Sequence, residues 1–548
     1  MIHLVRLKMN FKPPKYKHGL RYRMSTDKIA TKTAARQVCW IIQQSPHITH
    51  LQLDHLSIFS LKEMELLALT LHGLLWLQEI RLRICTDEAN VYQRGFFKIF
   101  FALPVSITVC KLSNEPPLYW KYYWHDVDPW NCELEGIEGE SELDIDMEDD
   151  EESGRSRQDT SDNIESVLAV QENEQVKEEK DQELDIPEVF CRDEPLSQLK
   201  KFKAWSMNTL TKKEVLQVFD HCPNVVSLCA SPVSVIGEDL EILARSISER
   251  CPHLRKLSSK RHPYAALVTA IMEAMSNQQK IEEIKIANMH LYDGMGAFRR
   301  AFARHSTTLR KLEFRYASIG NKDLLIILEL CESLEVLIQY PDFWSTPILT
   351  LADAISVPWA CKRIRHLEIA IGLEPVSLSP EELPYYQRPA PVTLLEEEKR
   401  QFADLERLYR EIGSLVHLEY MDLRGTYIDD EGDRIDELRE DSDYFTFPGM
   451  FSIRDDETGR PGYLDLLSGL VKLKELRGTV RVTTDEAKAT VGDREIEWVA
   501  NHWPALERVA FFTWENFVNA RFERLRDVLR PGLSLSQFPK WERRMYDP

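Results

Sequence analysis

Residues 222–230 read Cys-Pro-Asn-Val-Val-Ser-Leu-Cys-Ala, and residues 251–259 read Cys-Pro-His-Leu-Arg-Lys-Leu-Ser-Ser. In the first stretch apolar residues follow the spacing apolar-x-x-apolar-x-apolar, at Val225, Leu228 and Ala230. The second stretch has the same spacing, with a serine at the last position. Alternation of apolar and other residues predicts a short β-strand that buries one side.

The same spacing recurs along most of the chain. Clear copies begin at Ile48, Leu77, Val225, Ile281, Leu309, Ile364, Leu418 and Leu506, and degenerate copies begin at Leu4, Pro104, Leu199, Leu254, Leu334 and Leu473. In the middle block the first positions 199, 225, 254, 281, 309, 334 and 364 lie 26, 29, 27, 28, 25 and 30 residues apart. This period is typical of leucine-rich repeats, which run to about 20–29 residues.

Helical periodicity fills the intervals between these strands. Apolar residues recur at three- and four-residue spacing in residues 239–250, 265–275, 297–305 and 324–330. A single helix–strand unit cannot bury its own apolar side, so units must stack on one another. We therefore predict an α/β fold, a leucine-rich-repeat solenoid or horseshoe of roughly a dozen units. A parallel β-sheet would form its concave face, and helices would form the convex face.

Two intervals are longer than the others. The steps from Ile364 to Leu418 and from Leu418 to Leu473 are 54 and 55 residues, about two periods each. In each step a strand is either skipped or hidden inside an insertion. Within the first, Thr393-x-x-Glu396 has the spacing of a capping box and predicts the start of a helix there.

Cysteines recur at one register of the repeat. They stand three residues before the first apolar position at Cys222, Cys251, Cys331 and Cys361, and Ser45, Ser306 and Trp503 hold the equivalent place. A buried structural role explains this register, because cysteine behaves as a small apolar residue. The ten cysteines form no CxxC pair, so no zinc site or redox motif is predicted.

These motifs resemble a known family. Cys222-Pro-Asn-Val225, Cys251-Pro-His-Leu254 and Trp503-Pro-Ala-Leu506 resemble the cysteine-containing, ribonuclease-inhibitor-like repeats of fungal F-box/LRR substrate adaptors. The similarity extends over most of residues 37–520. It implies substrate recognition within an SCF-type ubiquitin ligase, with the ligase scaffold as a partner. The family's F-box motif has no counterpart here, so we expect either an F-box encoded upstream of Met1 or a protein without that module.

The composition divides the chain into five parts. We expect N-terminal repeats with an aromatic loop in residues 1–132 and a disordered acidic insertion in residues 133–188. Central repeats would follow in residues 189–372, and C-terminal repeats with long insertions in residues 373–520. A C-terminal tail or cap would occupy residues 521–548.

The net charge of −20 is concentrated in one of these parts. Residues 133–188 hold 23 acids and four bases, a net charge of −19, and few large apolar residues, which predicts disorder. The rest of the chain sums to −1, and within it residues 1–36 carry +9. A pI near 5.3 argues against general binding of nucleic acid or anionic membranes. No apolar stretch is long enough for a transmembrane helix.

Two sets of residues are candidates for binding a partner. Aromatic residues cluster before the acidic insertion, where Trp120, Tyr123, Trp124 and Trp130 would either anchor a partner or pin the root of the loop. Residues that alternate with the apolar positions are expected to be exposed on the concave face: His50, Gln52, Asp54, Glu79, Arg81, Arg83, Glu283, Lys285, Lys311, Glu313, Arg315, His366, Glu368, Tyr420, Asp422 and Arg424.

Motifs for chemistry are missing from the sequence. It has no GxxxxGK[ST], HExxH, GxSxG or complete GxGxxG motif, so we predict no catalytic residue, cofactor or metal. The favoured interpretation is a non-enzymatic protein-interaction module that recognises substrates for a ubiquitin ligase. The alternatives are an acidic-loop scaffold or chaperone for basic proteins and, third, a regulator of small GTPases. We expect protein partners, no membrane association and a cytoplasmic or nuclear location.

Overall fold

The computed structural model describes most of the predicted repeats. The described residues are 5–11, 35–58, 60–85, 89–114, 193–204, 212–229, 238–259, 265–276, 278–290, 295–318, 321–340, 349–376, 379, 381–427, 447–477, 491–510 and 523–535. The chain divides into two units, residues 1–115 together with 189–548, and residues 116–188. Every described residue belongs to the first unit, which is described here by itself. The proposed aromatic anchor and the acidic insertion lie outside the described residues.

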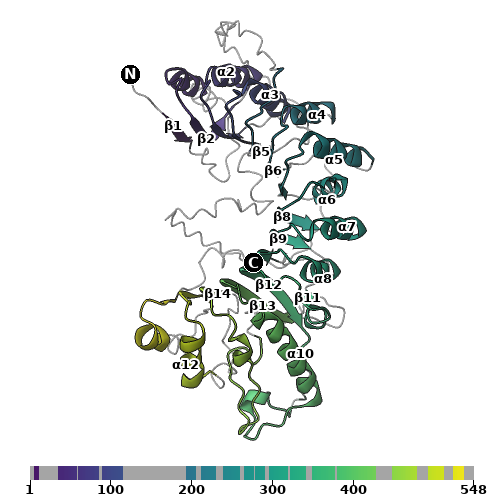
Figure 1. Cartoon of the computed structure of the whole chain (residues 1–548). Helices are drawn as coiled ribbons and strands as arrows, with labels where there is room; N and C mark the ends of the chain where they lie inside the picture. Colours follow the sequence, from purple (N-terminus) through teal and green to yellow (C-terminus); the bar gives the residue numbers. More distant parts are fainter. Residues whose placement is uncertain are drawn as a thin grey trace, which may run out of the picture. The chain divides into compact units, whose positions relative to one another are not determined.

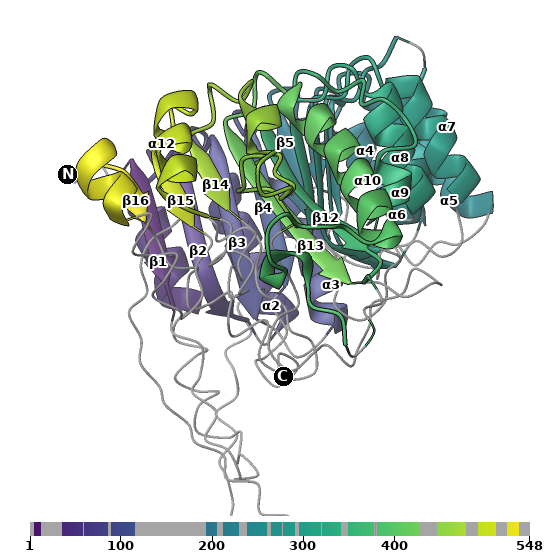
Figure 2. The same ribbon diagram turned by 90° about the horizontal axis from the view of Figure 1, so that it is seen from below.

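Sixteen strands of this unit form one sheet, and each strand pairs in parallel with its neighbours. The strands lie side by side in chain order, as the run from β1 to β4 shows in Figure 2. Strand β11 is off this path and pairs with β12. They are β1 (Arg6–Asn10), β2 (His50–Ser57), β3 (Glu79–Cys85), β4 (Val109–Asn114), β5 (Lys201–Ala204), β6 (Ser227–Cys229), β7 (Lys256–Ser259), β8 (Glu283–His290), β9 (Lys311–Ser318), β10 (Val336–Tyr340), β11 (Leu349–Thr350), β12 (His366–Leu373), β13 (Tyr420–Tyr427), β14 (Glu475–Arg477), β15 (Arg508–Ala510) and β16 (Ser534–Leu535).

Helices cover one side of this sheet, and α4 to α8 follow one another along its outer side (Figure 1). The described helices are α2 (Leu61–His72), α3 (Ala89–Ala102), α4 (Lys212–Asp220), α5 (Glu238–Arg250), α6 (Ala265–Ala274), α7 (Met295–His305), α8 (Asn321–Leu330), α9 (Leu351–Ala354), α10 (Glu396–Gly413) and α12 (Asp493–His502). Short turns of other helix types are η3 (Tyr385–Gln387), η5 (Leu464–Leu467) and η6 (Leu525–Leu529). The four helices predicted from periodicity correspond to α5, α6, α7 and α8.

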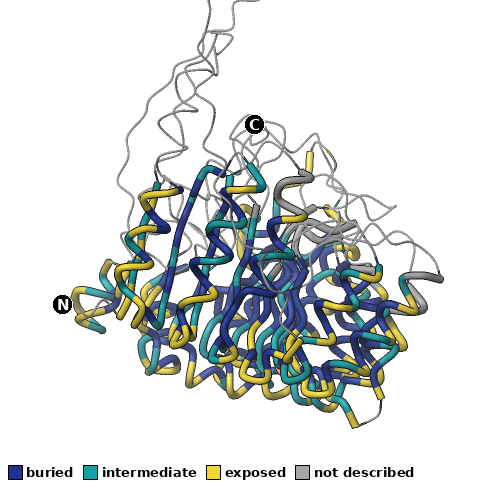
Figure 3. The backbone as a smooth tube through the Cα atoms, turned by 90° about the horizontal axis from the view of Figure 1, so that it is seen from above, coloured by how far each residue is buried: buried dark blue, intermediate teal, exposed yellow. Residues whose placement is uncertain are grey.

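The apolar positions of the repeat line up from strand to strand. Leu51 pairs with Ile80 across β2 and β3, and Leu228 pairs with Leu257 across β6 and β7. All four side chains are buried between the sheet and the helices. Buried residues run along the strands, while exposed residues gather on the outer helix turns and the loops (Figure 3). The fold is therefore the predicted leucine-rich-repeat solenoid, with the parallel sheet on one face and helices on the other.

Long insertions leave the sheet continuous. β12 pairs directly with β13, and β13 with β14, so both double-length intervals skip a strand instead of hiding one. In the same way β4 pairs directly with β5, although residues 115–200 separate them in sequence. Insertions of this kind leave the stacking of neighbouring repeats intact.

One degenerate copy was predicted in the wrong register. The predicted copy began at Pro104, but Cys110 pairs with Ile80, and Leu112 pairs with Leu82. The copy therefore begins at Ile107, three residues later. The register was missed because Cys110 fills a buried apolar position, as a small apolar residue can.

Buried cysteines fill the turn between helix and strand. Cys222, Cys251, Cys331 and Cys361 are fully buried, and all described cysteines are free thiols, so the predicted structural role is confirmed. Burial raises the pKa of the thiols of Cys251, Cys331 and Cys361 to about 12.

Two of the three predicted substitutes for cysteine occupy the same turn. The amide N–H of Ile48 donates to the carbonyl of Ser45, and that of Leu506 to the carbonyl of Trp503, as in the cysteine turns. The third prediction, Ser306, is wrong by one residue. There the Leu309 amide donates to the carbonyl of His305, because the turn is one residue longer, and His305 is the buried side chain.

The capping box predicted at Thr393 is also wrong. Helix α10 begins at Glu396, and its first turn is capped by Glu398, whose Oε2 accepts a hydrogen bond from the Leu395 amide at 2.9 Å. Arg388 holds this carboxylate through two further hydrogen bonds, of 2.6 and 2.9 Å. Arg388, which lies ten residues before Glu398, thus holds the capping carboxylate in place, and the Thr-x-x-Glu spacing does not reveal this contact.

Candidate functional site

Outward-facing residues of neighbouring strands form rows on the face opposite the helices, here called the concave face. The first row contains the residue that precedes the second apolar position of each repeat, such as His366 and Tyr420, which pair across β12 and β13. The second row lies two residues further along each strand and includes Glu368 and Asp422. Alternation along the strands places the sixteen predicted residues in the first row, in the second row or, for Asp54, Arg83, Arg315 and Arg424, two residues beyond the second row.

The predicted residues fall into two groups along the sheet. One group lies on β2 and β3, and the other lies on β8, β9, β12 and β13. Strands β4 to β7 separate the groups. The structure therefore divides these candidate residues into two regions with different surroundings.

Four residues that were expected to be exposed are instead buried: Asp54, Glu368, Asp422 and Arg424, each with at most 6% of its surface exposed. Side chains two residues apart on a strand share a face, so they can fold over one another. Asp54 Oδ2 accepts a hydrogen bond from Gln52 Nε2 at 2.5 Å, and the other three also contact residues two positions away. Each of these charged side chains is therefore shielded from solvent by a partner two residues away on the same strand.

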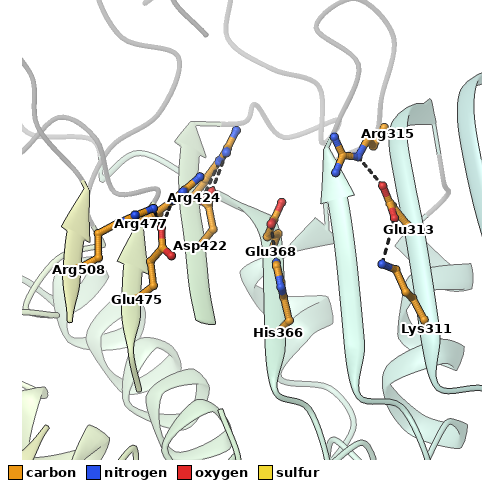
Figure 4. A network of polar contacts seen from close by, with 10 residues as sticks. All are labelled: Lys311, Glu313, Arg315, His366, Glu368, Asp422, Arg424, Glu475, Arg477 and Arg508. Atoms are coloured by element: carbon orange, nitrogen blue, oxygen red, sulfur yellow. Dashed lines mark hydrogen bonds and ion pairs between the residues drawn. The ribbon is translucent and has the colours of Figure 1, made fainter. Parts of the chain in front are cut away.

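Opposite charges at this two-residue spacing recur on strands of the second group and on neighbouring β14 (Figure 4). On β9, Arg315 Nε lies 2.6 Å from Glu313 Oε1. On β14, Arg477 Nε donates to Glu475 Oε1 at 2.5 Å. Each of these strands therefore neutralises much of its own outward charge.

Tyr420 lies on β13, between His366 of β12 and the outward residues of β14. Its ring stacks on the imidazole of His366, with centroids 3.9 Å apart and planes 21° apart. The guanidinium carbon of Arg477 lies 5.3 Å from the centre of the Tyr420 ring. Burial raises the pKa of the Tyr420 hydroxyl far above its usual range, and the carboxylates of Glu368 and Asp422 raise it further. The tyrosine therefore stays neutral and presents a rigid aromatic surface.

An alternating row of charges lies at the edge where the strands begin. This edge ladder contains the residue that follows the first apolar position of eight successive repeats, Arg255, Glu282, Arg310, Glu335, Arg365, Glu419, Lys474 and Glu507. Glu419 bridges its neighbours, since its carboxylate accepts hydrogen bonds of 2.7 Å from Lys474 Nζ and from Arg365 Nε. These two hydrogen bonds lower the pKa of Glu419.

Residues of the edge ladder and of the first row line a groove. Its volume is about 540 Å³. The lining residues are Glu335, Val336, Arg365, His366, Glu419, Tyr420, Lys474, Glu475, Glu507, Arg508 and Ser534. They belong to or immediately precede β10 and β12 to β16. Four carboxylates, three bases and a histidine line the groove. It can therefore contact both positively and negatively charged groups of a ligand.

Most of the groove was missed by sequence reasoning, which singled out only His366 and Tyr420 among its lining residues. Glu475 and Arg508 are outward residues of short strands near the C-terminal end of the sheet. The members of the edge ladder precede the strands, so alternation along one strand does not mark them. Reading the same repeat position across successive copies would have revealed their alternating charges.

Among the described residues, no three His, Cys, Asp or Glu side chains are arranged to hold a metal ion. No helix in the described ranges combines the length and the apolar character needed to span a membrane.

Comparison with known proteins adds little to this description. No family model matches the chain, and no curated protein matches it. Among solved structures, the crystal structure of a Rad7 and Elc1 complex in yeast is similar, with 15% sequence identity and a TM-score of 0.22. The similarity covers 59% of this chain and 82% of that chain. At this TM-score it supports no argument about function, which must rest on the residues themselves.

Proposed function

We propose that this protein is a non-enzymatic interaction module that binds a polypeptide segment of a partner in the groove over β10 to β16. The charged lining of the groove is the observation that supports this proposal. Sites for small molecules are mostly apolar and enclose their ligand. This one is lined chiefly by charged side chains, with Val336 and Tyr420 as its apolar surfaces. A polypeptide with side chains of both signs complements such a surface.

The chemistry of the described residues supports binding more than catalysis. The carboxylates of Glu419 and Glu475 are held in ion pairs with neighbouring bases. The thiols of the repeat turns are buried, and burial raises their pKa, so they are poor nucleophiles. A rigid, wide concave sheet is the surface through which repeat proteins commonly bind their partners.

The finer proposal is substrate recognition for a ubiquitin ligase. Its support is the resemblance of the Cys-Pro-x-apolar turns to those of F-box/LRR adaptors. Affinity purification of the full chain tests this role. Recovery of ligase scaffold subunits, together with clients that accumulate when the protein is depleted, would support it. Purification of clients without any ligase subunit would contradict the ligase role and leave the binding module intact.

A peptide array probed with the purified chain tests the groove. Tyr420→Ala combined with Arg508→Gln removes the aromatic surface and one base, and should weaken binding of selected peptides about tenfold or more. Arg300→Gln is the matched control, because Arg300 lies on helix α7, where its Nε is 2.9 Å from Glu273 Oε1. Equal binding by the groove variant and the control would contradict the proposal.

A further inference from the structure

The N-terminal part of the concave face has a charge pattern unlike the rest. From β1 to β5 its outward positions carry seven bases and two acids, a net charge of +5. The bases are Arg6, Lys8, Arg81, Arg83, Lys111, Lys201 and Lys203, and the acids are Asp54 and Glu79. This region lies at the opposite end of the sheet order from the groove.

In this region, outward residues two positions apart on a strand carry like charges instead of opposite charges. Two cations share a face on each of β1, β3 and β5, as Arg6 with Lys8, Arg81 with Arg83, and Lys201 with Lys203. On β9, β13 and β14 the corresponding pairs combine a base with an acid. The sheet neutralises its outward charge in one region and accumulates it in another.

The cations also face one another across strands. Arg81, Lys111 and Lys203 occupy the same row of β3, β4 and β5, and Lys8 continues this row on β1. These four residues are called the basic row. Neighbouring strands lie only about 4.8 Å apart. Like charges directly opposite one another destabilise a sheet.

Nearby acids offset only part of this charge. Asp54 Oδ1 lies 3.6 Å from Arg81 Nε and 3.4 Å from Arg83 Nε. Glu79 Oε1 lies 3.6 Å from Lys111 Nζ. Lys8 and Lys201 are exposed and form no side-chain ion pair with any described residue. An anionic partner would neutralise the charge of these two exposed lysines.

We infer that the basic row binds an acidic polypeptide segment of a partner protein. An extended acidic chain can place several carboxylates along a flat row of cations. Single-stranded nucleic acid is a poorer fit, because it binds through aromatic stacking as well as charge. The outward positions of β1 to β5 contain no Phe, Tyr or Trp. This inference goes beyond the proposed function, since it concerns different strands and a different ligand chemistry.

Fluorescence anisotropy with a short labelled peptide of alternating glutamate and serine tests the inference on the full chain. Arg81→Gln, Lys111→Gln and Lys203→Gln together should weaken binding about tenfold, since each exposed ion pair contributes up to roughly a fivefold change. Raising the salt concentration should weaken binding by the unaltered protein. Lys285→Gln is the control, because Lys285 is the next cation in the same row but lies 3.2 Å from Glu283 and 3.6 Å from Glu313.

Thermal unfolding of the triple variant supplies an independent readout. Removing like charges should leave the melting temperature unchanged or raise it, which separates loss of binding from loss of structure. If the triple variant does not fold, Lys111→Gln and Lys203→Gln are tested singly. Equal peptide binding by the variants and the unaltered chain, or equal weakening by Lys285→Gln, would overturn the inference.

Two further comparisons identify the ligand and the surface. Binding seen only after deletion of residues 133–188 would overturn the assignment to a separate partner and favour the chain's own acidic stretch. The groove variant Tyr420→Ala with Arg508→Gln should bind the acidic peptide normally. The proposal for the groove and the inference for the basic row can therefore be contradicted independently of each other.

Discussion

The guanidinium group of Arg424 donates two hydrogen bonds to the carboxylate of Asp422 on the same strand, from Nε at 2.8 Å and from Nη2 at 2.7 Å. Only 4% of the Arg424 side chain and 1% of the Asp422 side chain are exposed. Removing one member of such a pair leaves a buried charge, which costs about 3–5 kcal/mol. We therefore expect Arg424→Met to lower the free energy of unfolding by about that amount, measured by urea denaturation followed by circular dichroism.

The double variant separates the charge effect from loss of packing. Arg424→Met with Asp422→Leu removes both charges, so it should cost much less than Arg424→Met alone. Equal destabilisation by the single and double variants would mean that packing dominates and that the ion pair contributes little.

The cysteines of the repeat turns should resist alkylation in the folded protein. Cys251 and Cys331 are buried, and burial raises the pKa of each thiol to about 12, so almost no reactive thiolate is present at neutral pH. Iodoacetamide labelling followed by mass spectrometry should find both unmodified before unfolding and modified in denaturant. Cys85, which is partly exposed on β3, is the internal control and should react faster. Rapid native labelling of Cys251 would contradict the structural role.

The stability of the protein should fall as the pH drops below about 6.5, because His305 is buried in a neutral form. Burial lowers the pKa of His305, and nearby Arg304 lowers it further, although the hydrogen bond with the Met272 carbonyl at 3.1 Å opposes the shift. A depressed folded-state pKa means that the unfolded chain binds the proton more tightly. Its contribution to stability is therefore present above the unfolded-state pKa and is lost as the pH falls through the folded-state value.

Urea denaturation at several pH values measures this slope. In His305→Gln, the difference in stability between pH 7 and mildly acidic pH should be smaller than in the unaltered protein. Parallel pH profiles for the two proteins would show that other groups govern the acid response.

Periodicity predicts the architecture well because the same apolar positions are repeated in each unit. Leu51 and Leu257 are buried for one reason, the stacking of each repeat on the next. The register of the copy that begins at Ile107 was predicted wrongly because Cys110 occupies an apolar position of the repeat. Spacing alone cannot distinguish a buried cysteine from a surface residue.

The candidate site was less predictable because its members are defined by neighbours far away in sequence. From alternation alone, Asp422 is expected to be an exposed carboxylate. In the structure it is buried and paired with Arg424. Glu419 precedes its strand, and its role appears only when Arg365 and Lys474 are brought beside it from repeats 54 and 55 residues away. Alternation along one strand predicts which face a residue occupies, but pairing across strands decides whether its charge is available.

Deletion of residues 133–188 should leave the repeat sheet folded. β4 and β5 pair through Val109 with Lys201 and Cys110 with Phe202, so the sheet already continues across the insertion. The deletion shortens the connection between β4 and β5 from 86 residues (115–200) to 30, which lowers the entropy cost of closing the loop by about 1 kcal/mol. We therefore expect a melting temperature equal to or slightly above that of the full chain. Deletion of residues 199–204, which removes β5 and buried Phe202, is the contrasting variant and should unfold the neighbouring repeats. A large loss of stability on removing the acidic residues alone would mean that they contribute to the fold, contrary to the continuous pairing of β4 with β5.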